Sequence, residues 1–457
     1  MTTSPENTAL TIAMVSLGCA KNLVDAEVML GVWVKRGYEV IDDLNAATVI
    51  VVNTCAFLQC AVEEGIDKIL EITSYKERGC CQKLIVAGCM VERYRGKLVK
   101  EFPEVDAFVS IDELLQVDKI MGISTDCVDE TRESSFLYDH NSPRIVSSGS
   151  AFAYLKIADG CNRPCSFCII PKLRGKFRSR QMSSIVSEAG SMLSAGYKEI
   201  NLIAQDVTFY GRDLDNAEVN FVALLKNLLK ETKQYDYWLR ILYTYPTGVS
   251  EELIKLIKDE ANICDYLDLP LQHISDEVLK AMKRPFGEAK TRELMENVRK
   301  WHPQITCRSS FIVGFPGETE ADVERLAGFI EDGIFDHVGI FTYSPEEEAA
   351  SFALGDPVPE KEKQARRDYL MGIQQTVVNK RQGALIGKDE KVLIEGFHPE
   401  SNLLLVARSA RLAPEVDGQI IINDLGESDI SPADLIARFA TVRHTAVQSY
   451  DLISTHV

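Results

Sequence analysis

The segment Tyr154-Leu155-Lys156-Ile157 is largely apolar and is typical of a short β-strand. Shortly after it, the chain reads Gly160-Cys161-Asn162-Arg163-Pro164-Cys165-Ser166-Phe167-Cys168. The spacing of three and then two residues holds three thiolates around one cluster and leaves one iron without a protein ligand. Zinc sites usually close four ligands with paired CxxC words, and ferredoxin runs carry a further cysteine, which is missing within reach. The run therefore predicts a catalytic cluster at Cys161, Cys165 and Cys168. The alternative is three reduced cysteines packed in a loop.

The apolar word opens a series of strand words that alternate with helical patterns such as 222–230, 251–259 and 321–331. Such alternation predicts a partial parallel β/α barrel of six strands. Its active site is expected at the carboxyl ends of the strands, where the cysteine loop follows the first strand. The six predicted strands are 153–157, 199–204, 239–243, 266–269, 306–313 and 337–341.

A second set of cysteines lies near the amino terminus, where Cys19, Cys55 and Cys89 follow apolar runs. Read as parallel strands, these runs would bring three thiolates to one edge of a sheet, at the carboxyl ends where open α/β sheets place their sites. Taken alone, this spacing is weak evidence for a shared metal site, because a free cysteine is commonly a small buried hydrophobic residue. The runs are 12–17, 49–52 and 84–87.

The length of 457 residues exceeds what one hydrophobic core usually serves, so an α/β multidomain protein is expected. The stretch 129–150 is rich in Ser, Asp, Glu and Arg and is interpreted as a linker or an ordered surface loop. From about residue 384, short strand words separated by turn residues predict a small closed β-barrel. These words are 391–395, 403–408 and 419–422.

CxxxCxxC with Phe167 before the third cysteine resembles the signature of the radical S-adenosylmethionine superfamily, and 169–180 is similar to its methylthiotransferase branch. The words 16–25, 53–57 and 87–90 resemble the amino-terminal domain of that branch. The resemblance implies two 4Fe-4S clusters, one at Cys19, Cys55 and Cys89 and one at Cys161, Cys165 and Cys168. The unique iron of the latter would bind S-adenosylmethionine. The implied domains are a Rossmann-like or flavodoxin-like domain at 9–127, a linker at 128–146, a radical core at 147–383 and a TRAM domain at 384–457.

Further cofactor contacts follow from the same resemblance. Phe167 matches an aromatic that lies against S-adenosylmethionine, Gln205 and Asp206 end the second barrel strand, and Gly314 and Gly317 permit close backbone approach. The glycines could instead shape a turn, and Gln205-Asp206 could cap a loop. One or two of the five basic residues in 172–180 are expected to bind the cofactor carboxylate. His273 is expected to be structural rather than a base.

Charge favours a basic partner. The chain has 50 Lys and Arg against 68 Asp and Glu, a net charge of −18, and 384–457 has six against eleven, a net charge of −5. Nucleic-acid binders usually carry a basic surface, whereas an acidic surface suits a basic protein. Gly18-Cys19-Ala20-Lys21-Asn22 is also closer to the ribosomal-protein branch than to the transfer-RNA branch, which typically has Gly-Cys-Gln-Met-Asn. Two departures from the branch pattern are Ala20, where proline is usual, and Ala26, where serine is usual.

The ribosomal-protein branch acts on an aspartate of ribosomal protein S12. The resemblance implies that a 5'-deoxyadenosyl radical removes hydrogen from the aspartate β-carbon, and that sulfur from the amino-terminal cluster and a methyl group follow. A low-potential electron donor and a sulfur source would be partners. The alternatives are a transfer-RNA adenosine methylthiotransferase and a non-catalytic iron-sulfur sensor.

The remaining cysteines are interpreted as packing residues. No signal peptide opens the chain and no apolar run approaches the roughly 20 residues of a membrane span, so a cytoplasmic protein without disulfides is expected. These cysteines are Cys60, Cys80, Cys81, Cys127, Cys264 and Cys307.

Overall fold

The structure is a computed structural model that describes residues 10–117, 136–426 and 430–457. The chain forms two compact units. The first comprises Met1–Ser147, Asp159–Asn162 and Cys168–Arg180, and the second comprises Ser148–Ala158, Arg163–Phe167 and Gln181–Val457. No helix among the described residues has the length and apolar character that crossing a membrane requires.

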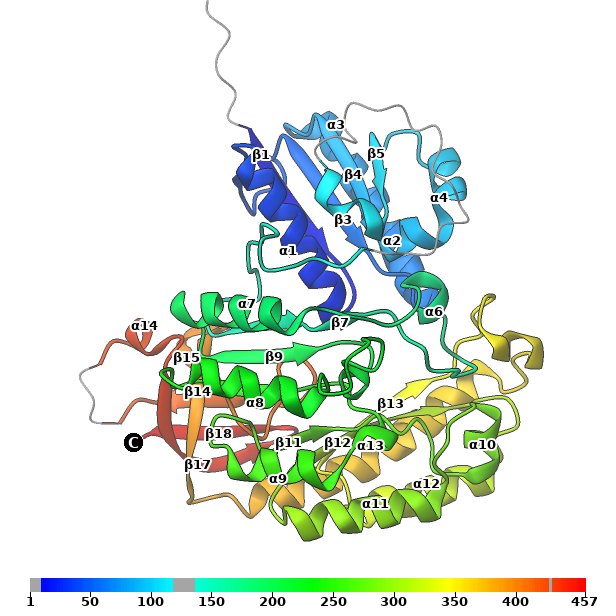
Figure 1. Cartoon of the computed structure of the whole chain (residues 1–457), viewed down its shortest axis with the longest axis vertical. Coiled ribbons are helices and arrows are strands. Elements are labelled where there is room, and N and C mark those ends of the chain that lie inside the picture. Colours follow the sequence, from blue (N-terminus) through cyan, green and yellow to red (C-terminus); the bar gives the residue numbers. More distant parts are fainter. Residues whose placement is uncertain (1–9, 118–135, 427–429) are drawn as a thin grey trace, which may run out of the picture. The chain divides into compact units, whose positions relative to one another are not determined.

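The first unit is built on a parallel sheet with the strand order β2-β1-β3-β4-β5. Figure 1 labels β1, β3, β4 and β5 of this sheet. This strand order is the doubly wound order of flavodoxin-like folds, in which the site lies at the carboxyl ends beside the point where the strand order reverses. The flavodoxin-like prediction and its three strands are confirmed, with strand ends displaced by one or two residues. The strands are β1 (Thr11–Ser16), β2 (Glu39–Val40), β3 (Val49–Thr54), β4 (Lys83–Gly88) and β5 (Ala107–Val109).

Helices cover both faces of this sheet. On one face Met29 and Trp33 of α1 pack with Val51 and Ile85, and on the other face Ile69 of α2 packs with strand side chains and with α4. The central strands β3 and β4 are buried on both sides, which explains why they read as continuous apolar runs, whereas the edge strand β2 is exposed. The helices of the unit are α1 (Ala20–Lys35), α2 (Gln59–Thr73), α3 (Tyr75–Arg78), α4 (Cys89–Glu101), η1 (Ile111–Gln116) and α6 (Ile170–Leu173).

The predicted linker 128–146 lies partly outside the described residues. Its described part, from residue 136, runs along α1 as an ordered segment of the first unit. Arg144 forms an ion pair of 2.6 Å with the buried Glu27, and the backbone N–H of Ser147 donates to the same carboxylate at 2.6 Å. Some polar groups of this segment therefore bind other residues of the first unit instead of facing solvent.

The second unit contains the predicted six-stranded β/α barrel, and this prediction is confirmed. Two sets of three parallel strands, β10-β9-β6 and β11-β12-β13, are joined by a parallel bridge between Leu239 and Ile263. The strands are β6 (Phe152–Lys156), β9 (Glu199–Ile203), β10 (Trp238–Ile241), β11 (Tyr266–Asp268), β12 (Thr306–Val313) and β13 (His337–Thr342).

Helices connect these strands. Most are amphipathic, as in α9, where Leu253, Ile254 and Ile257 are buried and the charged residues remain outside. The helices are α7 (Met182–Ser194), α8 (Phe221–Thr232), α9 (Glu251–Asp259), α10 (Asp276–Ala281), α11 (Glu288–Trp301) and α12 (Glu320–Glu331).

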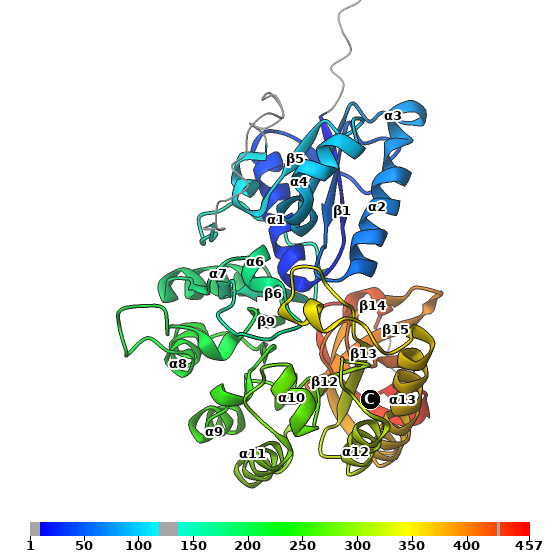
Figure 2. The same cartoon turned by 90° about the vertical axis from the view of Figure 1, so that its right-hand side faces the viewer.

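The C-terminal segment forms the expected closed β-barrel, with the order β14-β15-β16-β18-β17. Helix α13 (Glu360–Gly383) precedes it and packs against β13 and α12 (Figure 2). The strands are β14 (Asp389–His398), β15 (Ser401–Ser409), β16 (Ile420–Asp424), β17 (Phe439–Gln448) and β18 (Asp451–His456).

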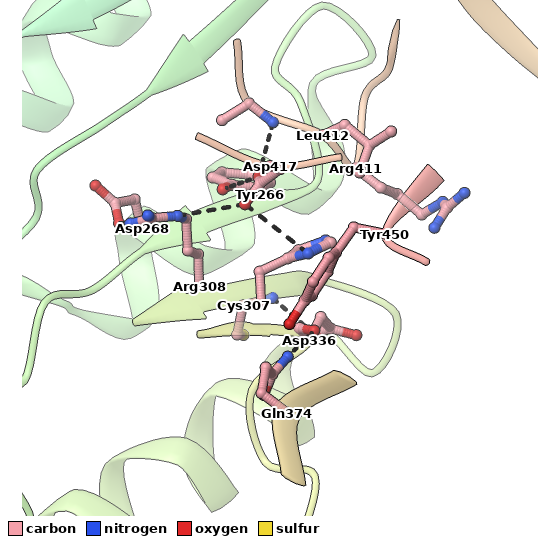
Figure 3. A network of polar contacts seen from close by, with 12 residues as sticks. Tyr266, Asp268, Cys307, Arg308, Asp336, Gln374, Arg411, Leu412, Asp417 and Tyr450 are labelled. Atoms are coloured by element: carbon pink, nitrogen blue, oxygen red, sulfur yellow. Dashed lines mark hydrogen bonds and ion pairs between the residues drawn. The ribbon is translucent and has the colours of Figure 1, made fainter. Parts of the chain in front are cut away.

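The segment between β15 and β16 joins the small β-barrel to the amino-terminal side of the β/α barrel. Tyr266, the first residue of β11, donates to Asp417 at 2.5 Å, and Arg308 lies 3.3 Å from the same carboxylate (Figure 3). Tyr154 of β6 donates to Glu415 at 2.7 Å. The TRAM-like barrel thus contacts the strand ends opposite to those that carry the predicted site.

A buried carboxylate reinforces this contact. Glu199, at the start of β9, is fully buried and lies 2.7 Å from both Arg240 of β10 and Arg408 of β15. The two guanidinium groups lower the pKa of Glu199 against the opposing effect of burial, which is the largest single influence on it. The carboxylate is therefore held ionised between two buried cations.

The remaining cysteines behave in two ways. Cys81, Cys264 and Cys307 are buried, as expected of packing residues, whereas Cys60 and Cys80 are exposed, so the interpretation as packing residues is wrong for these two. Cys127 lies outside the described residues. Burial raises the pKa of Cys264 to about 12, so this thiol stays protonated near neutral pH.

Replacing Glu199 by Gln should lower the stability of the second unit by about 3–5 kcal/mol, because breaking a buried ion pair leaves the remaining charges uncompensated. Chemical denaturation followed by circular dichroism measures this. Glu252→Gln, at an exposed pair with Lys226, is the matched control and should change stability little. Equal stability of the Glu199 variant and the control would contradict the assignment.

Candidate functional site

The three amino-terminal cysteines lie at one edge of the first unit's sheet. Cys55 directly follows β3, Cys89 directly follows β4, and Cys19 stands in the turn between β1 and α1. Because β1, β3 and β4 are adjacent parallel strands, their carboxyl ends meet at the same edge. The three cysteines therefore share one edge of the sheet.

Two glycines allow these turns to approach closely. Gly18 has φ +94°, and a Cβ there would stand 2.7 Å from Cys55 Cβ and 3.1 Å from its sulfur. Gly88 also has φ +94°, and a Cβ there would stand 2.4 Å from Asn53 Oδ1. Glycine is required at both positions for conformation and for space.

Asn22 ties the three cysteine-bearing turns together. Its amide Nδ2 donates to Leu17 O at 2.7 Å and to Thr54 O at 3.2 Å, and the Cys89 thiol lies 3.9 Å from its Oδ1. The sequence analysis quoted Asn22 only as part of the family motif around Cys19, without assigning it a role. Its fixed offset of three residues from Cys19 was the available signal.

Burial and nearby positive charges shift the pKa values of the thiols in opposite directions. Burial raises the pKa of Cys89 to about 12. The Cys19 side chain is exposed, and although desolvation by the surrounding protein opposes ionisation, the charges of Lys21 and Arg174 outweigh it and lower the pKa of Cys19. Cys19 is therefore the thiol most readily converted to a thiolate, the form that binds metal.

No group of three or more His, Cys, Asp or Glu side chains within the described ranges has the geometry to hold a single metal ion. A four-iron cluster has a different requirement, because its thiolates bind separate iron atoms. The donors at this edge are three cysteines beside cationic groups, which is the donor chemistry that such clusters use.

The CxxxCxxC run is shared between the units. Cys161 and Cys168 belong to the first unit, where the Cys161 N–H donates to Gly175 O at 3.1 Å. Cys165 belongs to the second unit, where Arg284 Nη1 lies 3.7 Å from its sulfur.

Three hydrogen bonds fix Ser166 within the second unit. Its N–H donates to Met282 O at 3.0 Å, its hydroxyl donates to Ala281 O at 2.8 Å, and its carbonyl accepts from Ser351 N–H at 2.8 Å. The backbone that follows Cys165 is thus anchored to the end of α10. Sequence reasoning did not identify Ser166 or Arg284.

The predicted cofactor residues have diverse partners. Asp206 is buried and binds Arg163 of the cysteine loop at 2.7 Å, and Arg163 and Arg284 both lie over the ring of Tyr245, at 3.8 and 4.2 Å. Gln205, at the end of β9, is partly buried. The role of Asp206 and Gln205 as cofactor contacts stays a prediction.

Phe167 packs against a cluster that includes Met282 and Phe315. Gly314 and Gly317 have φ values of +76° and +92° in the turn from β12 to α12, and a Cβ at Gly314 would meet the side chain of Lys363 at 2.4 Å. Space around Gly317 is open, so the two glycines differ in what they would admit.

His273 is fully buried, lies 3.1 Å from Glu318 and accepts the Ser275 N–H at 2.9 Å. In the basic run, Lys172 and Lys176 are exposed and Arg178 donates to the carbonyls of Arg174 and Lys176. Arg174 is buried among side chains of the first unit.

Comparisons with known proteins match three families along the chain. Residues 11–110 match the family described as "Uncharacterized protein family UPF0004", residues 155–330 match the radical SAM superfamily, and residues 386–457 match the TRAM domain.

Solved structures share the fold. The radical S-adenosylmethionine methyltransferase TsrM from Kitasatospora setae aligns with a TM-score of 0.56 at 16% identity, covering 75% of this chain and 77% of that one.

Curated relatives match almost the whole length. The ribosomal protein uS12 methylthiotransferase RimO of Syntrophotalea carbinolica is 45% identical over 97% of this chain and 96% of its own, and that of Geobacter sulfurreducens is 44% identical over 97% of each. These matches show a transferase with a radical SAM domain. The chain belongs to the RimO family of methylthiotransferases.

Proposed function

We propose that this enzyme attaches a methylthio group to the β-carbon of an aspartate in ribosomal protein S12. The observation that carries the proposal is the meeting of Cys19, Cys55 and Cys89 at one sheet edge, in a chain that also holds the CxxxCxxC run. Full-length similarity to proteins named for uS12 methylthiolation supports the choice of substrate.

Two sets of cysteines have separate roles in this proposal. Cys161, Cys165 and Cys168 hold the cluster that binds S-adenosylmethionine, and Cys19, Cys55 and Cys89 hold a second one. When bound, these groups supply a carbon-centred radical that can remove an unactivated hydrogen, and the sulfur that replaces it.

The protein's own residues prepare this chemistry. Arg163, bound to Asp206, holds the cysteine loop against the end of β9, and Ser166 anchors the same loop to α10. Asn22 and the glycines keep the three amino-terminal turns in contact. The chain thereby holds the cysteine side chains in place before any cofactor is present, which reduces the entropy cost of cluster binding.

Replacing each cysteine set in turn should halve the iron content. The reconstituted wild-type chain should bind about eight irons, and both Cys19/Cys55/Cys89→Ala and Cys161/Cys165/Cys168→Ala about four. Iron and sulfide analysis measures this, and the matched control is Cys60→Ala, at an exposed cysteine in neither set. A full iron load in either triple variant would show that its cysteines are not ligands.

Gly18→Ala should disrupt the amino-terminal cluster because the new Cβ would collide with Cys55. Gly37→Ala is the matched control, since Gly37 has φ +89° but no atom within 4 Å of a Cβ. Both variants should lose about 1–2 kcal/mol for the left-handed backbone. Only Gly18→Ala should also lose iron, measured in the Cys161/Cys165/Cys168→Ala background. Equal iron retention would refute the steric argument.

Deleting the gene should remove a methylthio mass increment from an aspartate of ribosomal protein S12. Mass spectrometry of S12 and of total transfer RNA, with and without the gene, measures this, and restoring the gene should restore the increment. Loss from a transfer-RNA adenosine instead would identify the transfer-RNA activity. If neither changes and the reduced protein does not cleave S-adenosylmethionine, the non-catalytic sensor is the remaining candidate.

A further inference from the structure

Arg174 is a guanidinium buried beside the amino-terminal cysteines. Its exposed fraction is 1%, and it ends α6 in the segment Cys168–Arg180 of the first unit. Removing such a charge from water is unfavourable, and only an ion pair of excellent geometry offsets this desolvation penalty. The contacts of Arg174 therefore report what it is placed there to do.

The two terminal nitrogens of Arg174 have different partners. Nη1 lies 2.9 Å from an Asp25 oxygen and 3.0 Å from an Asp159 oxygen, whereas Nη2 lies 3.3 Å from the sulfur of Cys89. A guanidinium kept only for its ion pairs would not need to direct its other nitrogen at a thiol. The hydrogen bond to Asp159 and the ion pair with Asp25 both hold Nη1, which leaves Nη2 to donate toward the sulfur of Cys89.

The charge of Arg174 also acts beyond Cys89. Cys89 shares its sheet edge with Cys19 and Cys55, so a cation fixed beside Cys89 lies near all three cysteine-bearing turns. Three thiolates add three negative charges to this edge of the sheet. A fixed cation next to them offsets part of their mutual repulsion, and the burial of Arg174 and Cys89 limits how far water screens their interaction.

The observed partner of Arg174 differs from the partner predicted for its segment of the sequence. Arg174 belongs to the basic run that follows CxxxCxxC, for which the sequence predicts a cofactor carboxylate as partner. The structure directs Arg174 instead to Cys89, a residue of the other cysteine set. Asp159, which helps to orient it, stands just before Cys161 in the chain.

We propose that Arg174 is a positioning residue for the cluster at Cys19, Cys55 and Cys89, donating an N–H···S hydrogen bond to the Cys89 ligand and supplying a fixed positive charge. This rests on the proposed function, which places a cluster at these cysteines. Hydrogen bonds to sulfur and local charge both set the reduction potential of such clusters. Arg174 thus raises the potential of the cluster that carries sulfur and slows the loss of its iron.

The test uses the full chain with Cys161, Cys165 and Cys168 replaced by Ala, so that only the amino-terminal cysteines can hold iron. In this parent, Arg174→Gln removes the charge, and Arg174→Lys keeps the charge but has a single nitrogen that cannot serve two carboxylates and a sulfur together. Arg240→Gln is the matched control, because Arg240 is an equally buried arginine with a carboxylate partner in the other unit. Each variant is reconstituted with iron and sulfide.

Two readouts follow, iron release to a chelator and the midpoint potential from a redox titration monitored by electron paramagnetic resonance. Arg174→Gln should release iron about 10- to 100-fold faster than the parent and have a lower midpoint potential, as expected for loss of a group that supports a metal ligand. Arg174→Lys should give a smaller change in both. Arg240→Gln should leave the potential unchanged, because a loss of stability alone does not alter the field at the cluster.

The outcomes separate this inference from the proposed function. A parent that binds no cluster overturns both. A parent that binds a cluster whose iron release and potential are unchanged in both Arg174 variants overturns only the role of Arg174. An equal potential shift in Arg240→Gln also overturns it. If Arg174→Gln does not fold, the potential of Arg174→Lys decides, and a value equal to that of the parent refutes the hydrogen bond.

Discussion

Parallel pairing of β1, β3 and β4 is the constraint on which the amino-terminal site depends. In a parallel sheet every strand ends on the same side, so the turns after three adjacent strands meet, however long the helices between them. Cys19, Cys55 and Cys89 are separated by more than thirty residues at each step and still share one edge. The hydrogen-bond ladder, rather than any local motif, provides the proximity, and Gly18, Gly88 and Asn22 refine it to contact distance.

Much of the fold could be predicted because several central strands, such as β3 and β4, are buried on both faces and appear as uninterrupted apolar runs. Helix α13 was not predicted, since its 24 residues are largely charged and its buried positions include Lys363 and Gln374, which have no apolar signature. Strands β17 and β18 were missed because polar residues interrupt them, and His444 is buried within β17 through a hydrogen bond to Ser454. Apolar periodicity detects burial only where burial excludes polar groups.

The candidate site was predictable in its cysteines but not in its supporting residues. The family motifs indicated the positions of the thiols. By contrast, Arg174, Arg284 and Ser166 acquire their roles from partners that are distant in sequence. Asp206 illustrates the difference. Its place at a strand end was correct, but its carboxylate binds Arg163, and no local pattern specifies that pairing. The net charge of the TRAM-like barrel likewise overstates how acidic its surface is. Asp417 contributes to that charge, but it points inward to Arg308 and Tyr266 and adds little to the outer surface (Figure 3).

The first unit is discontinuous in sequence, since Asp159–Asn162 and Cys168–Arg180 belong to it although segments of the second unit lie between them. This connectivity bears on synthesis. Chains begin to fold as they leave the ribosome, and amino-terminal domains usually complete first. The first unit cannot do so when Ser147 emerges, because Arg174 and Asp159 are still to be made. Its maturation must wait until Arg180 has been added, by which time β6, the first strand of the barrel, is already present. The first unit is thus completed only after synthesis of the second unit has begun.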